Sequence, residues 1–181
     1  GMRMNQITKE SRYADVVERA LYNTVLAGIA LDGKSFFYVN PLEVWPDNCI
    51  ERTSKEHIKP VRQKWFGVAC CPPNIARTLA SMGQYIYFTD KNTVYVNLYI
   101  SNEAQIDLDE GTTKIQIESD LTNTGHIVLK VTPDEGSTNN LAIRIPDYVK
   151  AYTIRKDGAL LEHQDICQAY LTIGGISKQT E

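Results

Sequence analysis

The stretch that decides the fold is residues 93–100, which read Thr-Val-Tyr-Val-Asn-Leu-Tyr-Ile. Every second position carries a large aliphatic side chain: Val94, Val96, Leu98 and Ile100. Because successive side chains of a strand point to opposite faces, this alternation predicts a strand with one buried face. Before residue 90 the apolar residues follow a helical spacing instead, so the chain changes architecture near this point.

Short strand-like segments continue from this stretch toward the C-terminus, over residues 104–108, 114–118, 126–131, 140–145, 151–155 and 170–173. Turn-forming pairs such as Glu110-Gly111 and Asp157-Gly158 separate them. Several short strands with no helix between them are typical of an antiparallel β-sandwich. We therefore predict a sandwich over about residues 93–173.

Two helices are predicted on the N-terminal side, over residues 11–31 and 73–87. In the first, apolar residues recur with the spacing of one helix face, and we expect Val17, Leu21 and Val25 to be buried. Asp15 and Glu18 suit its early turns, where acidic side chains oppose the helix dipole. The second helix begins after Pro72-Pro73, since proline is favoured in a first helical turn.

The fold class is therefore α+β, a short helical segment followed by an antiparallel β-sandwich. The predicted domains are residues 1–90, which are helical, and residues 91–181, a sandwich that is truncated at its end. A chain of 181 residues is long enough for one domain with such an appendage.

Composition excludes several partners and compartments. The net charge of −3 argues against a nucleic-acid partner. The longest uncharged apolar stretch, residues 20–31, is shorter than the roughly 20 residues that span a bilayer, so no membrane partner is expected. No apolar signal-peptide region follows the N-terminus, and the four cysteines are too sparse for a disulfide scaffold. We expect a cytoplasmic, reduced protein.

Residues 65–75, Trp-Phe-Gly-Val-Ala-Cys-Cys-Pro-Pro-Asn-Ile, carry the clearest local chemistry. Cys70 and Cys71 lie at the predicted start of a helix, where free N–H groups and the helix dipole stabilise a thiolate. A thiolate is both a nucleophile and a soft metal ligand. The alternative is a pair of small buried apolar residues, because free cysteine is often buried. Adjacent cysteines alone are a weak zinc signal.

Other candidate residues carry weaker signals. Residues 36–39, Phe-Phe-Tyr-Val, form a short apolar run that is typical of a strand. Tyr38 gives this run an aromatic hydroxyl, although a core tyrosine with one hydrogen bond is the simpler interpretation. Glu43 follows that run, and a carboxylate near the end of a strand is a candidate catalytic group, although a solvated surface side chain is the simpler interpretation. The three histidines, His57, His126 and His163, are scattered over a loop, a strand and a turn, so their spacing indicates no cluster.

Four sequence elements, in this order and spacing, resemble the glycoside hydrolase family 127 β-L-arabinofuranosidases, a former domain of unknown function. They are Ala-Leu-Tyr-Asn (20–23), Leu-Asp-Gly-Lys-Ser-Phe-Phe-Tyr-Val-Asn-Pro-Leu-Glu (31–43), Lys-Pro-Val-Arg (59–62) and Cys-Cys-Pro-Pro-Asn-Ile-Ala-Arg (70–77). The match over residues 11–100 is specific, and residues 101–173 are similar in pattern only.

The resemblance implies a fold, a mechanism and a set of site residues. It implies that the helical segment is the end of a catalytic (α/α) barrel, and that a β-sandwich follows it. It also implies retaining hydrolysis of L-arabinofuranoside-type oligosaccharides by a cysteine nucleophile held on zinc, with a glutamate as acid/base. Cys70 matches the nucleophile, which is also a zinc ligand. Cys71 matches a second zinc ligand, and Tyr38 matches a sugar-pocket tyrosine.

The chain also departs from the family pattern. The acid/base glutamate and a Glu-x-Cys element with the other zinc ligands lie upstream of the Ala-Leu-Tyr-Asn helix in the family. We therefore expect a C-terminal fragment that is inactive alone, with zinc absent or only partly bound. Asp47-Asn48-Cys49 imitates the Glu-x-Cys element, but at a different place in the chain.

Two other functions stay open from the sequence. One is a non-catalytic sandwich that binds carbohydrate or a partner chain, and the other is a small redox or metal protein that uses the adjacent thiols. In either case the apolar helix at residues 11–31 and an open sheet edge favour self-association. We expect a homodimer with twofold symmetry, the commonest closed arrangement.

Overall fold

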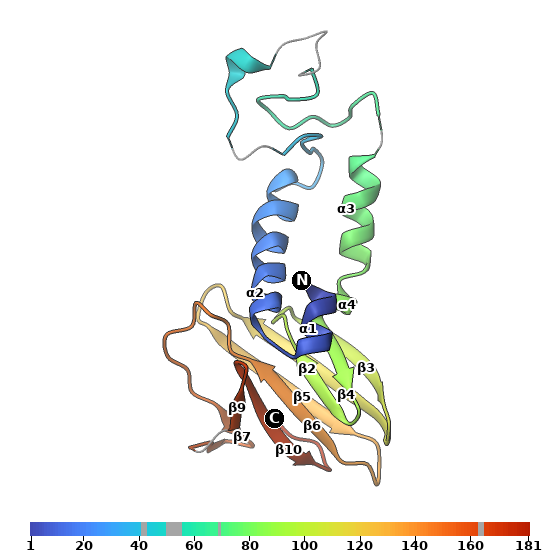
Figure 1. Ribbon diagram of the computed structural model, residues 1–181, viewed down its shortest axis with the longest axis vertical. Coiled ribbons are helices and arrows are strands. Elements are labelled where there is room, and N and C mark those ends of the chain that lie inside the picture. Colours follow the sequence, from blue (N-terminus) through green and yellow to red (C-terminus); the bar gives the residue numbers. More distant parts are fainter. Residues whose placement is uncertain (41–42, 50–55, 69, 163–164) are drawn as a thin grey trace. The chain divides into compact units, whose positions relative to one another are not determined.

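The computed structural model describes residues 1–40, 43–49, 56–68, 70–162 and 165–181. Its helices are α1 (Met2–Thr8), α2 (Arg12–Arg19), the π-helical η1 (Ala20–Val25), the 3₁₀ turns η2 (Leu26–Gly28) and η3 (Pro46–Asn48), α3 (Cys71–Ala80) and α4 (Gly83–Ile86). Its strands are β1 (Tyr87–Asp90), β2 (Thr93–Val96), β3 (Asn102–Leu108), β4 (Gly111–Asp120), β5 (His126–Pro133), β6 (Asn139–Arg144), β7 (Arg155–Lys156), β8 (Ala159–Leu160), β9 (Asp165–Cys167) and β10 (Tyr170–Ile176). The predicted α+β class is confirmed (Figure 1).

The chain divides into two compact units. One consists of residues 1–16 together with residues 83–181, and the other of residues 17–82. The first unit contains every strand of the described chain, and the second contains α3 and the loops that precede it. The first sixteen residues therefore pack with the strands although they lie far from them in the sequence. The described helices include none that is long and apolar enough to cross a membrane.

The strands form a five-stranded sheet in the order β1-β2-β6-β10-β9, a three-stranded sheet in the order β3-β4-β5, and the hairpin β7-β8. Their pairings are antiparallel with one exception, because β2 and β6 run parallel from Thr93 beside Asn140 to Val96 beside Ile143. The prediction of wholly antiparallel strands is wrong at this pair. The whole β3–β5 meander connects β2 to β6, and so long a connection lets the chain return in the same direction.

The predicted alternation at residues 93–100 is confirmed for its first half. Val94 and Val96 are buried on β2. From Asn97 onward three consecutive residues are buried, Asn97, Leu98 and Tyr99, so the regular strand ends at Val96. The N–H of Asn97 donates to the carbonyl of Ile86 at 2.8 Å. Ile86 is the last residue of α4 and lies opposite Asn97 when the register of β1 with β2 is extended by one pair.

The shortest strands are the ones that the sequence did not indicate correctly. The predicted strand over residues 151–155 is wrong, because only Arg155 of that range is in β7. The pair β7 and β8 and the neighbouring β9 span two or three residues each, too few to show an alternating pattern. The expected strand-like run at residues 36–39 is reduced to single bridges from Phe36 to Ile29 and to Gln63.

The predicted helix over residues 11–31 is divided into α2, η1 and η2 and ends at Gly28. Its buried face is partly polar and consists of Ser11, Ala14, Asp15, Glu18 and Leu21. Burial of Leu21 is confirmed, whereas Val17 and Val25 are only half-buried and Val16 is 58% exposed. The large apolar side chains exposed within residues 11–31 are Val16, Tyr22 and Leu31, and the homodimer stays a prediction.

The helix α1 was not predicted, because its sequence Met-Arg-Met-Asn-Gln-Ile-Thr has no helical apolar stripe. One polar residue anchors it. Asn5 is fully buried, and its amide donates to the carbonyl of Glu10 at 2.9 Å and to the hydroxyl of Tyr170 at 3.0 Å. The predicted helix over residues 73–87 begins earlier, at Cys71, and is interrupted after Ala80 before α4.

Candidate active site

The adjacent thiols lie at the N-terminus of α3, as the sequence predicted. Cys70 is the N-cap residue and Cys71 the first residue of the helix. The prolines that follow occupy the first turn, where their missing N–H groups cost no hydrogen bond. Both cysteines are free, and Cys70 is exposed while Cys71 is half-buried. The exposure of Cys70 disfavours the interpretation of this pair as two small core residues.

Tyr38 lies against both thiols although it is more than thirty residues away in the sequence. The thiol of Cys70 donates to the Tyr38 hydroxyl oxygen at 2.9 Å, and the thiol of Cys71 donates to the Tyr38 backbone carbonyl at 3.2 Å. The two sulfur atoms are 4.0 Å apart. The structure thus brings together the three residues that the sequence singled out as nucleophile, metal ligand and sugar-pocket residue.

The surroundings make the two thiols unequal. The hydrogen bond with the Tyr38 hydroxyl lowers the pKa of Cys70, and the hydrogen bond with Cys71 lowers it further. Desolvation raises the pKa of Cys71, and the neighbouring Cys70 raises it again. The hydrogen bond with Cys70 raises the pKa of Tyr38, which keeps its hydroxyl protonated. When the pair loses one proton, Cys70 is therefore the thiolate, and the Tyr38 hydroxyl becomes the donor to it.

Aromatic rings hold Tyr38 in place. Its ring lies 4.9 Å from that of His57 and 5.6 Å from that of Phe66, measured between centroids. Phe66 is buried and also contacts Phe36 at 5.4 Å. Paired backbone hydrogen bonds of 2.9 and 3.0 Å between Phe36 and Gln63 bring these two loop segments side by side.

His57 is the site neighbour that sequence reasoning missed. It lies in a loop without periodic spacing, and no local pattern connects it to Tyr38. The bridge between Phe36 and Gln63, which pairs two irregular segments, has no sequence signal either.

The start of α3 is fixed by Asn74, one turn into the helix. Its side-chain amide donates to the carbonyl of Cys70 at 2.7 Å, and its own side-chain oxygen accepts from Arg77. Thr78 donates to the Asn74 carbonyl at 2.9 Å. The hydrogen bond from Asn74 to the Cys70 carbonyl ties the backbone of the N-cap residue to the helix. It therefore holds the Cys70 thiol at the helix terminus.

The two sulfur atoms fit one edge of a zinc site. Two thiolates at about 2.3 Å from a tetrahedral zinc ion lie about 3.8 Å apart, close to the separation of Cys70 and Cys71. Within the described ranges, no group of three or more His, Cys, Asp or Glu residues is placed to hold a metal. The thiol of Cys49, in the segment that imitates Glu-x-Cys, donates to the carbonyl of Trp45 at 3.6 Å.

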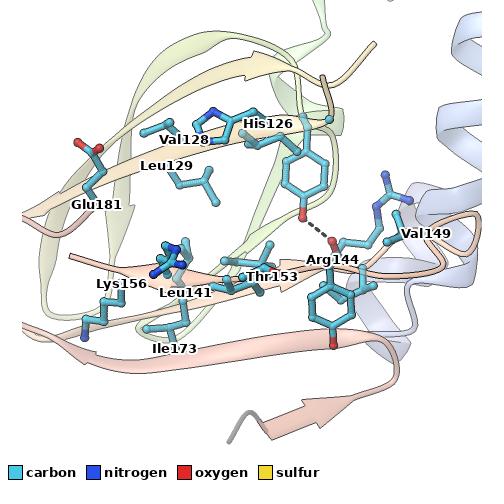
Figure 2. Close-up of a pocket in the computed structure, with 18 of the residues that line it drawn as sticks. His126, Val128, Leu129, Leu141, Arg144, Val149, Thr153, Lys156, Ile173 and Glu181 are labelled. Atoms are coloured by element: carbon cyan, nitrogen blue, oxygen red, sulfur yellow. Dashed lines mark hydrogen bonds between the residues drawn. The ribbon is translucent and has the colours of Figure 1, made fainter. Parts of the chain in front are cut away.

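The described hydrogen bonds of the two thiols involve none of the remaining candidates. Glu43 is exposed. His126 is the first residue of β5, in the other compact unit, where it lines a cavity (Figure 2). His163 lies outside the described residues.

Comparison with known proteins gives the class of the chain. The family model of the GH127 β-L-arabinofuranosidase catalytic domain matches residues 1–84, and that of the GH127 β-L-arabinofuranosidase middle domain matches residues 93–181. Together the two models span most of the sequence. The chain therefore belongs to glycoside hydrolase family 127, as its motifs predicted.

Individual relatives are similar over nearly the whole chain. A non-reducing end β-L-arabinofuranosidase from Bifidobacterium longum subsp. longum is 36% identical over 162 residues, which cover 86% of this chain and 24% of that protein. A crystal structure of a GH127 β-L-arabinofuranosidase from Geobacillus stearothermophilus T6 is 41% identical, with a TM-score of 0.82, and the match covers 98% of this chain and 28% of that one. A structure described as a glycoside hydrolase is 29% identical, with a TM-score of 0.82, and the match covers 98% of this chain and 29% of that one. The chain thus spans about a quarter of the length of its curated relative.

Proposed function

We propose that this chain is the part of a β-L-arabinofuranosidase that supplies the nucleophile, and that Cys70 is that nucleophile. The observation that carries the proposal is the 2.9 Å contact between the Cys70 sulfur and the Tyr38 hydroxyl at the start of α3. A nucleophilic cysteine needs an exposed thiol whose thiolate is stabilised by its surroundings. Cys70 is exposed, and both the helix terminus and Tyr38 stabilise its ionised form.

The proposed reaction has two displacements at the anomeric carbon of a terminal L-arabinofuranoside. In the first, the Cys70 thiolate forms a bond from sulfur to carbon while the bond to the glycosidic oxygen breaks, and that oxygen takes a proton from an acid. In the second, water adds to the same carbon, its proton is taken up by the same group acting as base, and Cys70 leaves as a thiolate. Two inversions retain the configuration at that carbon.

Tyr38 and Cys71 have separate roles in this proposal. The Tyr38 hydroxyl donates to the thiolate and orients it, and its ring forms one wall of the sugar pocket. Cys71 remains protonated in the metal-free pair, because its thiol donates to the Tyr38 carbonyl and its pKa is raised. With zinc bound, both sulfurs would be ligands, and the metal would keep them deprotonated at neutral pH.

We expect the chain by itself to bind zinc weakly or not at all. Cys70 and Cys71 provide two protein ligands, whereas a stable tetrahedral site has three or four. Metal analysis of protein purified without chelator checks this expectation. Near-stoichiometric zinc that disappears in the Cys71→Ser variant would contradict it.

The activity is best tested in a chimera, because in this family the acid/base glutamate lies in the barrel upstream of the matching segment. The described partners of the Cys70 sulfur are Tyr38 and Cys71, neither of which is a carboxylic acid. We therefore expect no turnover by the chain alone. In the chimera, residues 11–100 replace the equivalent segment of the Geobacillus enzyme, which is 41% identical and shares the fold. Hydrolysis of p-nitrophenyl β-L-arabinofuranoside by the chimera would support the proposal. A folded chimera without hydrolysis would overturn it.

Tyr38→Phe should make the Cys70 thiol less reactive at neutral pH. The Tyr38 hydroxyl lowers the pKa of Cys70, so its removal raises that pKa and shifts the pH profile of alkylation toward higher pH. Iodoacetamide labelling across a pH series, with the site assigned by mass spectrometry, measures the shift. Tyr152→Phe, at an exposed tyrosine of the other unit, is the matched control and should leave the profile unchanged. An unshifted profile in Tyr38→Phe would show that the hydrogen bond does not tune Cys70.

A further inference from the structure

The end of the helix formed by α2, η1 and η2 binds the segment that carries Tyr38. The last carbonyls of a helix have no partner within it, so another segment has to supply the donors. The carbonyl of Gly28 accepts from the backbone N–H of Phe37 at 2.9 Å. The carbonyl of Thr24 accepts from the side-chain amide of Asn40, also at 2.9 Å. Residues on both sides of Tyr38 are thus tied to the end of this helix.

Arg62 makes a third connection to the same helix end. Its guanidinium donates to the carbonyl of Ala27, and its central carbon lies over the ring of Phe37, 4.6 Å from the ring centroid. Arginine suits this position because a guanidinium can donate hydrogen bonds while it stacks on an aromatic face. The next residue, Gln63, exchanges backbone hydrogen bonds of 2.9 and 3.0 Å with Phe36, which holds Arg62 beside this segment. Arg62 therefore joins Phe37 to the helix end.

The Tyr38 hydroxyl needs such support because it lies at the end of a long side chain in an irregular segment. A functional group has to be held to within about 0.5 Å of its productive position. The hydroxyl contacts the Cys70 sulfur at 2.9 Å, and a small change in the backbone at residue 38 would displace it. The rings of His57 and Phe66 lie against the ring of Tyr38 and limit its rotation. These ring contacts do not restrain the backbone of the segment, whereas the hydrogen bonds to the helix end do.

We propose that Arg62 is a positioning residue for the candidate active site. Together with Asn40 it ties the segment around Tyr38 to the end of the helix, and thereby holds the Tyr38 hydroxyl at the Cys70 sulfur. The described hydrogen bonds of the two thiols involve Tyr38 and each other, and not Arg62. Arg62 therefore acts on Cys70 through Tyr38. Its effect on catalysis rests on the proposed function, whereas its effect on the position of Tyr38 does not.

Two other roles of Arg62 fit its contacts less well. A guanidinium that binds a substrate presents its N–H groups to an open pocket, whereas Arg62 is half-buried, with one face on Phe37 and an N–H on the Ala27 carbonyl. A guanidinium that stabilises the Cys70 thiolate by its charge alone would do so whether or not residue 38 carries a hydroxyl. A comparison of variants with and without that hydroxyl separates such a charge effect from positioning.

The first test follows Tyr38 directly in the whole chain. A fluorinated tyrosine is incorporated at position 38 alone, and its fluorine resonance is recorded by NMR. Arg62→Met removes the hydrogen bond to Ala27 and the charge over Phe37, and should shift or broaden this resonance. Lys64→Met, at an exposed lysine of the same loop, is the matched control and should leave the resonance unchanged. An unchanged resonance in the folded Arg62→Met variant would overturn the proposal.

A milder variant decides if circular dichroism shows that Arg62→Met does not fold. The Asn40 side chain is exposed, so Asn40→Ala removes the hydrogen bond to Thr24 without opening the interior. It should also shift or broaden the resonance at position 38, because one connection of the segment to the helix end is lost. An unchanged resonance would then overturn the proposal.

The second test measures the consequence for catalysis in the chimeric enzyme. Arg62→Met should lower kcat/KM for p-nitrophenyl β-L-arabinofuranoside at least about tenfold, because a displaced active-site group loses much of its effect. In a Tyr38→Phe background the same substitution should cost less than about threefold, since no hydroxyl remains to be misplaced. Equal losses in both backgrounds would overturn the proposal in favour of a direct effect of charge or of folding.

The two tests also separate this inference from the proposed function. Lys64→Met should retain the activity of the chimera, which excludes a general effect of positive charge in this loop. If the unsubstituted chimera folds but does not hydrolyse the substrate, the proposed function is wrong. The fluorine resonance still decides in that case whether Arg62 positions Tyr38.

Discussion

In the chimeric enzyme, Cys70→Ser is expected to lower kcat/KM for p-nitrophenyl β-L-arabinofuranoside by at least about 10³-fold. A serine hydroxyl keeps its proton at neutral pH, because its pKa lies far above that of a thiol, and neither Tyr38 nor the helix terminus compensates for that difference. The variant retains the size and the hydrogen-bonding ability of the side chain. The loss in kcat/KM therefore measures the contribution of the Cys70 thiolate to catalysis.

Serine variants of two other cysteines distinguish a nucleophilic role of Cys70 from a structural role. Cys49, which lies inside the transplanted segment, is a free, half-buried cysteine at the end of η3, and Cys49→Ser should leave hydrolysis unchanged. Cys71→Ser should lower the zinc content as well as the activity, since Cys71 is proposed as a ligand. Intact mass after incubation with substrate should show a glycosyl adduct that Cys70→Ser lacks. Activity retained in Cys70→Ser, or an adduct on another residue, would show that Cys70 is not the nucleophile.

The sequence predicted the part of the candidate site that depends on a local motif. Cys70 and Cys71 were placed at a helix start from the prolines that follow them, and the structure has α3 begin there. Tyr38 was identified by resemblance to the family. Its contact with Cys70 was not predictable from periodicity, because the segments that connect them are irregular and are aligned by the backbone pairing of Phe36 and Gln63. For the same reason, the position of His57 beside Tyr38 was not predicted.

Apart from β2, whose four residues belong to a clear alternating run, the strands that were predicted are the longer ones. The predicted strands that correspond to β3, β4, β5, β6 and β10 are six residues or longer in the structure, and each shows enough positions for an apolar pattern. The parallel pairing of β2 with β6 was missed, because a strand's direction relative to its neighbour depends on its connection and leaves no trace in its own residues. The sandwich arrangement of the two sheets remains a prediction.

The helix at residues 12–28 shows how a distant residue overrides a local rule. An acidic residue in a first turn is ordinarily an exposed partner of the helix dipole. Asp15 is instead buried, because Arg144 on β6 lies directly against it. With Asp15 on the buried face of the helix, the apolar side chain of Val16 lies on the exposed face. No sequence pattern connects residues 15 and 144, which are 129 positions apart.

Arg144→Met is expected to destabilise the unit formed by residues 1–16 and 83–181 by about 3–5 kcal/mol, the cost of breaking a buried ion pair by removing one partner. The Arg144 side chain is fully buried, and its guanidinium forms a salt bridge with Asp15. Its Nε also donates to the carbonyl of Asn97 at 2.6 Å. Methionine fills a similar volume but leaves the carboxylate and the carbonyl buried without this donor.

Urea unfolding followed by circular dichroism measures the change, and two further variants interpret it. Arg155→Met, at an exposed arginine of β7, is the matched control and should change the free energy of unfolding by no more than about 0.5 kcal/mol. The double variant Asp15→Asn/Arg144→Met should lose less than the sum of the two single losses, because asparagine removes the uncompensated charge.

These results would show what joins the first sixteen residues to the strands. Asn97 accepts from Arg144 through its carbonyl, and its side-chain amide donates to Asn5 of α1 at 2.9 Å. One buried network thus connects α1 and the start of α2 to the five-stranded sheet. If it holds them there, Arg144→Met should also make the peptide bonds of residues 1–16 accessible to proteolysis before the strands unfold. Additive losses in the double variant, with unchanged proteolysis of residues 1–16, would mean that apolar packing alone holds them.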